Sequence, residues 1–466
     1  MTTSTPPESA APGSSGAALG GAALGGAALG GAAGAPRAGA RVPSWLLAAA
    51  TVFAIAWCGN QFTPLLVMYR LEGLAPLEVN ILLGVYVLGL APALILGGTL
   101  SDLIGRRPLL LPAPGIAIAA GVFLAAGSGS MVLLGIGRVL SGLALGLAMA
   151  VGTSWVKELS QAPHDPLASP KEGARRASLA LTGGFALGAA AAASLAQFAP
   201  MRESLPYLVN VALTAVVWPA LFRVPETAGA RVLAARAAAS GALTDADTGA
   251  VAVIPSSKGF LRALRIPSAL DPRFLLLVLP MAAWIFGSSA AAYAILPVLL
   301  MPSVPGLEIG YSGLMCLVAL AFGFTVQQFV RRFDLPRVPG ATVFGIAATM
   351  LGMLACAWIA AELGASPDVW WLAFGAAALL GAGYGLLLVS GLELVQEIAP
   401  AAELARLTAV FYAIAYVGFF VPAILSALNA FVPYPVLFLA GAVIAAVAGA
   451  VIVLSALRFS RPRPSR

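Results

Sequence analysis

The chain has 466 residues, of which 60% are hydrophobic and only 10% charged; its mean hydropathy is +0.95 and its formal net charge is +7. Soluble globular domains carry roughly 25% charged residues, so this composition excludes a water-soluble fold. The apolar runs are continuous and about 20 residues or longer, which indicates transmembrane helices and excludes an outer-membrane barrel, whose strands alternate apolar and polar residues.

The N-terminal segment, residues 1–42, is rich in Gly and Ala and repeats the pentapeptide GAALG three times between Gly16 and Gly30. It has few large apolar side chains with which to bury a core, so we expect a disordered tail. It also lacks the basic region followed by an apolar region that marks a cleaved signal peptide.

From Ser44 onward, apolar runs alternate with short polar breaks and predict an all-α, polytopic membrane protein. We expect two six-helix bundles at 43–222 and 272–457, a central loop at 223–271 and a basic tail at 458–466. The twelve predicted transmembrane helices are 44–69, 77–99, 108–127, 130–156, 177–199, 204–222, 273–300, 311–330, 339–361, 369–396, 407–428 and 433–457.

The distribution of basic residues predicts the orientation in the membrane. Of the 26 Lys and Arg residues, 23 fall in segments that are cytoplasmic if both termini are cytoplasmic, whereas Arg70 and Arg202 fall in outside loops and Arg138 lies within a span. Lys and Arg accumulate on the cytoplasmic side of membrane proteins. The basic excess therefore indicates a multi-pass protein of the cell membrane with cytoplasmic N- and C-termini, and it requires no nucleic-acid partner.

The two halves contain matching landmarks in the same order, which favours an internal duplication over chance similarity in an Ala- and Gly-rich sequence. GTLSDLIGRR at Gly98–Arg107 follows the second predicted span, and GFTVQQFVRR at Gly323–Arg332 follows the eighth. In the fourth and tenth spans, two glycines four residues apart match similarly: Gly142 and Gly146 with Gly381 and Gly385.

The first of these segments, placed by the predicted spans in a cytoplasmic turn, is the strongest local motif. Glycines near both ends permit a tight turn at the membrane surface. A carboxylate at the interface, here Asp102, is costly unless a cation or a helix start compensates it, and Arg106 and Arg107 suit that role. An ordinary basic turn would explain the arginines but not the Gly, Asp and Gly spacing.

This segment resembles the loop between the second and third spans of the major facilitator superfamily, G-x-L-[AS]-D-x-x-G-[RK]-[RK]. Every defined position is present: Gly98, Leu100, Ser101, Asp102, Gly105, Arg106 and Arg107. The resemblance implies a conformational latch, in which the aspartate is held by an arginine and by the start of the eleventh helix while the site faces outward. In the second copy Gln327 replaces the aspartate, so any latch there is expected to be weaker.

Arg138 lies in the fourth span and is followed by Gly142 and Gly146 on one helix face. A charge near mid-bilayer costs about 2.5–3.5 kcal/mol and usually faces a cavity or a partner. R-x-x-x-G-x-x-x-G is also similar to a fourth-span motif of the same superfamily that is linked to proton coupling. We expect Arg138 to take part in coupling; the alternative is an anchor whose side chain reaches the outer interface.

Uncharged polar and aromatic residues on the predicted inner helices suit a neutral or amphipathic solute. In the first span Trp57, Asn60 and Gln61 are spaced to share one helix face. Each candidate has an alternative role in helix packing. The candidate cavity residues are Trp57, Asn60, Gln61, Trp284, Ser288, Tyr293, Tyr412 and Tyr416.

Acidic residues are scarce in the predicted spans, so few groups are available to carry a proton. Glu78 near the outer end of the second span and Glu393 near the inner end of the tenth are the candidates, together with Arg138. The three cysteines lie in apolar runs and the single His164 in a polar loop. No metal site and no cofactor are expected.

These features predict a secondary active transporter, and not an enzyme, that moves a small organic solute by alternating access. The first hypothesis is proton-coupled export of an amphipathic compound, because the candidate cavity is aromatic and poor in charge. The alternatives are uptake of a neutral nutrient such as a sugar and, as a different class, a transport-inactive membrane sensor or scaffold. We expect the protein to act as a monomer in the lipid bilayer.

Overall fold

A computed structural model describes most of the chain from Val42 onward. The predicted tail up to Arg41, most of the central loop and the last seven residues lie outside the described part. The described residues are 42–169, 171–228, 266–333, 335, 338–363, 366–400 and 403–459.

In the first half, the described residues form nine helices whose apolar stretches join into six spans. They are α1 (Ser44–Asn60), α2 (Leu66–Leu71), α3 (Pro76–Ile104), α4 (Arg106–Leu110), α5 (Ala113–Ala125), α6 (Met131–Leu147), α7 (Thr153–Leu159), α8 (Glu172–Phe198) and α9 (Leu205–Leu221). A π-helical segment at Ala148–Gly152 joins α6 to α7 without a break, so the fourth span runs from Met131 to Leu159.

The second half repeats this pattern. Its helices are α12 (Leu279–Ala290), α13 (Leu296–Leu300), α14 (Glu308–Gln327), α15 (Gly340–Glu362), α16 (Leu372–Ile398), α17 (Leu404–Val417), α18 (Val421–Leu428) and α19 (Tyr434–Phe459). Two further π-helical segments, Phe274–Val278 and Ala291–Ile295, lie in the seventh span.

The fold class that the sequence predicts is confirmed. Among the described residues, eleven helical stretches are long and apolar enough to cross a membrane, and no β-strand is formed. The sixth predicted span corresponds to α9, which has 17 residues and would be about 26 Å long, near the lower limit for crossing a bilayer.

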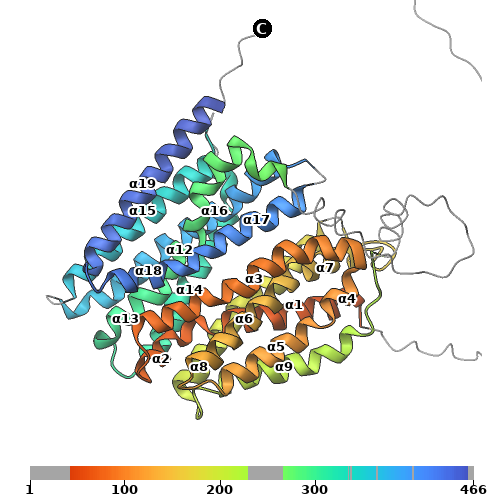
Figure 1. The fold of residues 1–466 in the computed structure, drawn as a ribbon, viewed down its shortest axis with the longest axis horizontal. Helices are drawn as coiled ribbons and strands as arrows, with labels where there is room; N and C mark the ends of the chain where they lie inside the picture. The colour runs from red at the N-terminus through yellow and green to blue at the C-terminus, as the bar shows by residue number, and fades with distance from the viewer. Residues whose placement is uncertain are drawn as a thin grey trace, which may run out of the picture. The chain divides into compact units, whose positions relative to one another are not determined.

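Helices pack pairwise in the same way within each half, as a duplicated fold requires. In the first half α3 packs on α6, and α5 packs on α6 and α9; in the second half α14 packs on α16, and α15 packs on α16 and α19. Figure 1 shows the two sets as neighbouring groups, the first in red to yellow-green and the second in green to blue. The halves meet where α3 contacts α17 and α18, and where α8 contacts α14.

The glycine pairs that match in sequence also occupy matching positions in the fold. A Cβ on Gly142 of α6 would lie 2.0 Å from the carbonyl oxygen of Tyr86 on α3. A Cβ on Gly381 of α16 would lie 2.1 Å from the carbonyl oxygen of Ala319 on α14. Small residues let transmembrane helices approach until their backbones touch, and both halves use this contact.

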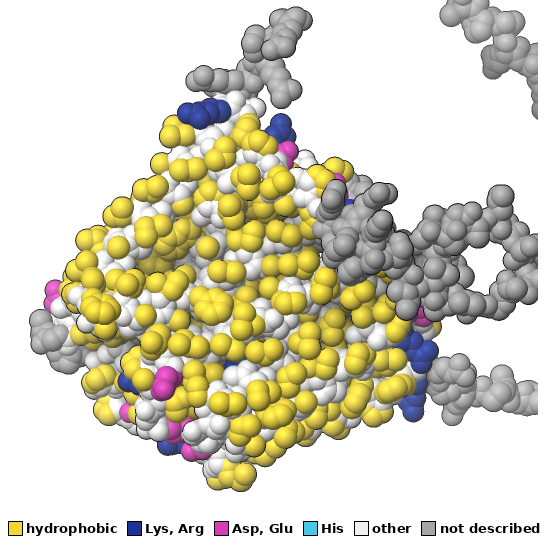
Figure 2. All heavy atoms as spheres, in the orientation of Figure 1, with side chains coloured by type: hydrophobic (Ala, Val, Ile, Leu, Met, Phe, Trp, Pro, Cys, Tyr) yellow, Lys and Arg dark blue, Asp and Glu magenta, His cyan; other side chains and the backbone are white. Residues whose placement is uncertain are grey.

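The flank of the molecule is apolar, as expected of a surface in contact with lipid. Figure 2 shows hydrophobic side chains over the middle of one face and charged side chains gathered near its edges. An exposed apolar area of this extent is unfavourable in water and favourable in a bilayer. On α19 the exposed apolar side chains include Val436, Leu439, Val443, Val447 and Leu454.

Replacing Gly142 with Ala is expected to lower the thermal stability of the protein in detergent. The new methyl group would collide with the α3 backbone, and overpacking of this kind costs about 1–3 kcal/mol. Gly135→Ala on the same helix is the matched control, because a Cβ there would meet no atom within 4 Å. Equal unfolding temperatures for the two variants would contradict the close α3–α6 contact.

Candidate functional site

The latch motif lies mostly within a helix, which corrects the expectation of a turn from Gly98 to Arg107. Residues up to Ile104 are the last turns of α3, and Gly105 alone separates α3 from α4. Gly105 has a φ of 106°, and a Cβ on it would lie 2.5 Å from Oε2 of Glu226. A positive φ is unfavourable for residues that carry a Cβ, and there is no room for a Cβ here. The sharp turn therefore requires glycine at this position.

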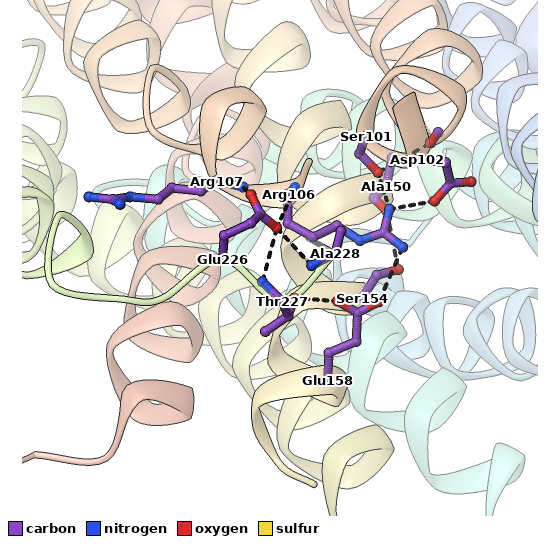
Figure 3. Close-up of polar contacts among 11 residues, drawn as sticks. Ser101, Asp102, Arg106, Arg107, Ala150, Ser154, Glu158, Glu226, Thr227 and Ala228 are labelled. Carbon is purple, nitrogen blue, oxygen red and sulfur yellow. Dashed lines mark hydrogen bonds and ion pairs between the residues drawn. The ribbon is translucent and has the colours of Figure 1, made fainter. Parts of the chain in front are cut away.

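Arg106 is the centre of a polar network at this turn (Figure 3). Its Nη1 donates to Oδ1 of Asp102 at 2.8 Å and to the hydroxyl of Ser101, and its Nη2 donates to Oε1 of Glu158 at 3.1 Å. The Arg106 side chain is only 9% exposed, so two carboxylates compensate a charge that is largely removed from water. The network joins the end of α3 to the end of α7.

Glu226, just after the sixth span, completes the network from the other side. Its carboxylate accepts hydrogen bonds from the backbone N–H groups of Arg106 at 3.0 Å and Arg107 at 2.8 Å. It also accepts the N–H groups of Thr227 and Ala228. Glu226 was not predicted from the sequence, because a single carboxylate in a predicted loop belongs to no motif with a defined spacing. Its position directly after an apolar span was the one feature that pointed to it.

Among the described residues, Asp102 does not make the contact with the start of the eleventh helix that the family resemblance implies. The Asp102 side chain is 64% exposed, and among the described residues its partner is Arg106. At the start of the eleventh span, Glu403 instead accepts hydrogen bonds from the hydroxyl and the N–H of Ser268, which lie 2.5 and 3.0 Å away. These bonds hold the pKa of Glu403 below its usual value.

The two halves are joined by hydrogen bonds at the end of the bundle opposite the latch motif. Nδ2 of Asn80 on α3 donates to Oγ of Ser426 on α18 at 2.8 Å. Gln197 on α8 donates to the carbonyl of Gly306 and accepts from the N–H of Gly310, both at 2.8 Å. We call this the Asn80 end, and the end that carries the latch network the Arg106 end.

A cavity of about 610 Å³ lies between the halves. Next to the Asn80 end it borders Arg138 and Thr63. Toward the Arg106 end its lining reaches Ser178 in the second turn of α8 and Gln327, the last residue of α14. Its volume falls in the range of small-molecule sites, and it extends toward the end where the latch contact is missing.

The walls of the cavity are mainly aromatic and aliphatic. Phe286 of α12 stacks on Tyr416 of α17 with ring centroids 4.2 Å apart, and Phe419 stacks on Phe286 at 5.1 Å. Tyr86 of α3 meets Tyr416 and Phe419 edge-on from the other half. An apolar solute body therefore finds aromatic faces from both halves.

Half of the predicted cavity residues line this cavity. Asn60, Tyr293, Tyr412 and Tyr416 are part of the lining, whereas Trp57, Gln61, Trp284 and Ser288 are not. The four lining residues come from the first, seventh and eleventh spans, and additional lining residues such as Ser289, Tyr384 and Tyr86 were not singled out from the sequence.

Gln61 and Ser288 show why helical spacing alone misplaces residues. The backbone stays helical at Gln61, whose N–H donates to the carbonyl oxygen of Trp57 at 3.0 Å, so its side chain points about 100° around the helix from that of Asn60. Its side chain is fully buried in the first half. Ser288 is also fully buried, and its hydroxyl lies 3.4 Å from the carbonyl oxygen of Leu380 on α16.

The three coupling candidates occupy different environments. Arg138 borders the cavity. Glu78 is exposed at the start of α3, where its carboxylate accepts the N–H of Ala75 at 2.7 Å in a capping box. Glu393 is exposed on α16, one helical turn beyond Val389, which lines the cavity on the same helix face.

These features define a helical membrane transporter with a central cavity between two repeated halves. Residues 46–362 match the Major Facilitator Superfamily, and the chain belongs to this family. Comparison with curated proteins gives no match. The family indicates a transporter and not an enzyme.

The fold is similar to those of several solved transporters. One is a POT family transporter in complex with 5-aminolevulinic acid, with 14% identity, a TM-score of 0.66, and coverage of 90% of this chain and 97% of that chain. A D-xylose-proton symporter has 15% identity, a TM-score of 0.61 and coverage of 90% and 97%. A nucleoside transporter has 11% identity, a TM-score of 0.61 and coverage of 90% and 100%.

Asp102→Asn is expected to lower the transport rate at least fivefold in proteoliposomes while the protein still inserts and folds. The substitution removes the charge that pairs with Arg106 and that would meet the start of α17 in the other conformation. Glu172→Gln is the matched control, because it removes a carboxylate from an ion pair with Arg175 elsewhere in the chain. A rate equal to that of the unmodified protein would exclude a latch role for Asp102.

Proposed function

We propose that the protein is a secondary active transporter that exports a small amphipathic organic solute in exchange for protons. The single observation that carries this proposal is the cavity of about 610 Å³ between the halves, with aromatic walls and few charges. A solute with a large apolar part gains by leaving water for such a surface. The absence of a nucleotide-binding sequence motif favours an ion gradient as the energy source.

Transport would follow from rocking of the halves about the cavity. In the present conformation hydrogen bonds at Asn80 and Gln197 hold the Asn80 end together. Opening that end requires these bonds to break. Closing the Arg106 end would bring Asp102 to the start of α17, where the helix dipole favours a carboxylate. The two sets of contacts are then formed in alternate states.

The proposed direction rests on the basic residues. The Arg106 end carries Arg106, Arg107, Lys171 and Arg176, and we place it in the cytoplasm by the positive-inside rule. The cavity then extends toward the cytoplasm in this conformation, and an amphipathic solute would enter from that side.

Of the two candidate carboxylates, Glu393 is the better placed to exchange protons. A residue that carries a proton must lie at the cavity or its opening, so that it is accessible from each side of the membrane in alternate conformations. Glu393 follows Val389 by one turn toward the Arg106 end, whereas Glu78 is engaged in capping α3. We therefore assign proton exchange to Glu393.

The transport proposal can be tested with purified protein in liposomes. An outward-directed proton gradient, made by an acidic vesicle interior, should drive accumulation of an amphipathic fluorescent compound inside the vesicles to several-fold the level in protein-free vesicles. A protonophore should abolish this accumulation. The proposal would be contradicted if no dye in a panel of anionic, neutral and cationic dyes accumulates with either an acidic or an alkaline vesicle interior. Accumulation only with an alkaline interior would indicate uptake instead of export.

Glu393→Gln is expected to abolish the pH dependence of transport, because the amide cannot take up a proton. Glu78→Gln is the matched control and should keep the pH dependence of the unmodified protein, since Gln can still accept the hydrogen bond from Ala75. The measurement is the initial rate in proteoliposomes between pH 5.5 and 8. An unchanged pH profile for Glu393→Gln would remove this residue as the proton carrier.

A further inference from the structure

Arg138 is a fully enclosed cation without a carboxylate partner in the part of the chain that the structure describes. It is 1% exposed in the middle of α6. Its Nε donates to the carbonyl of Leu82 at 3.1 Å, and its Nη2 lies 3.5 Å from the carbonyl oxygen of Leu83. Its Nη1 is buried and has no hydrogen-bond partner among the described residues. One donor of a charged group is therefore unused in the interior of the protein.

The surroundings of Arg138 contribute π faces and neutral hydroxyls but no opposite charge. The guanidinium lies 4.5 Å from the ring centroid of Phe62 and 4.4 Å from that of Tyr86. No ion pair of the described residues includes Arg138. Its titratable neighbours are tyrosines and a cysteine, which are neutral near pH 7. Stacking lowers the cost of burial but leaves a net positive charge.

Arg138 is also the sole charged side chain among the described residues that line the cavity. Beside it, the hydroxyl of Tyr86 forms no hydrogen bond with a described residue. The cavity thus combines one positive charge, two unused donors and an aromatic wall from the other half. A cationic solute would be repelled by this site, and a neutral solute would leave the charge unbalanced.

We propose that the solute is an amphipathic organic anion, whose carboxylate or similar anionic group binds Arg138 and the hydroxyl of Tyr86. The apolar part of the solute lies against Phe286, Tyr416 and Phe419. Arginine suits this task because its guanidinium remains charged when buried and can present two N–H groups to one carboxylate. The inference rests on the proposed transport function and specifies the class of substrate.

Three compounds with the same aromatic body test the proposal: 2-naphthylacetate, 2-naphthylacetamide and 2-(2-naphthyl)ethylammonium. Binding to the full chain in detergent is measured by titration calorimetry. The anion is expected to bind at least tenfold more tightly than the amide, and the cation most weakly. Equal affinities for the three compounds, or the absence of saturable binding by the anion, would overturn the inference.

Variants of Arg138 locate the effect. Arg138→Gln should weaken anion binding at least tenfold while amide binding stays within about twofold, which also shows that the cavity is intact. Arg138→Lys should retain part of the preference, because Lys supplies the charge without the planar fork. Arg458→Gln, at the exposed end of α19, is the control for removal of an arginine and should bind as the unmodified protein does. Retained anion preference in Arg138→Gln would overturn the inference.

Flux measurements separate this inference from the transport function. Anion-selective binding without protein-dependent flux in proteoliposomes would overturn the proposed transport and leave the assignment of the anion site standing. Flux of all three compounds without charge preference would overturn the anion site alone. If Arg138→Gln does not fold, the comparison of the three compounds on the unmodified protein still decides the matter.

Discussion

The cost of placing a charge in an apolar medium governs where polar chemistry occurs in this protein. A buried ion is tolerated only when other groups compensate it. Arg106 meets this condition through two carboxylates, Asp102 and Glu158, at one end of the bundle. Arg138 lacks such a partner and is surrounded by backbone carbonyls and aromatic rings. The first arrangement stabilises a conformation; the second leaves capacity for a ligand.

Close contacts between helix backbones are expected to make each half rigid. Gly142 on α6, against α3, and Gly381 on α16, against α14, occupy equivalent positions, so each half contains a tightly joined helix pair. The contacts between the halves include side-chain contacts such as the hydrogen bond of Asn80 with Ser426 and the edge-on contact of Tyr86 with Tyr416, which can separate without unfolding either half. Motion is therefore expected between the halves and not within them.

The fold was predictable from the sequence because the bilayer imposes one dominant pattern, namely long apolar runs with basic residues at their ends. The glycines that match in the two halves also occupy matching positions in the fold, whereas the motif around Asp102 lies mostly in α3 and not in the predicted turn. Residues whose role depends on a tertiary contact could not be predicted from the sequence. Glu226 acts through backbone N–H groups that no sequence pattern specifies. Helical spacing also did not separate Asn60, which lines the cavity, from its neighbour Gln61, which is fully buried and does not.

The carboxylates of Glu226 and Glu403 attach the two ends of the central loop to the two halves. Glu226 attaches the outgoing chain to the turn between α3 and α4, and Glu403 attaches the returning chain, through Ser268, to the start of α17. In the proposed transport cycle, these two elements would approach each other when the Arg106 end closes. The separation of the two ends of the loop would then change in each cycle, and a molecule bound to both of them would slow turnover.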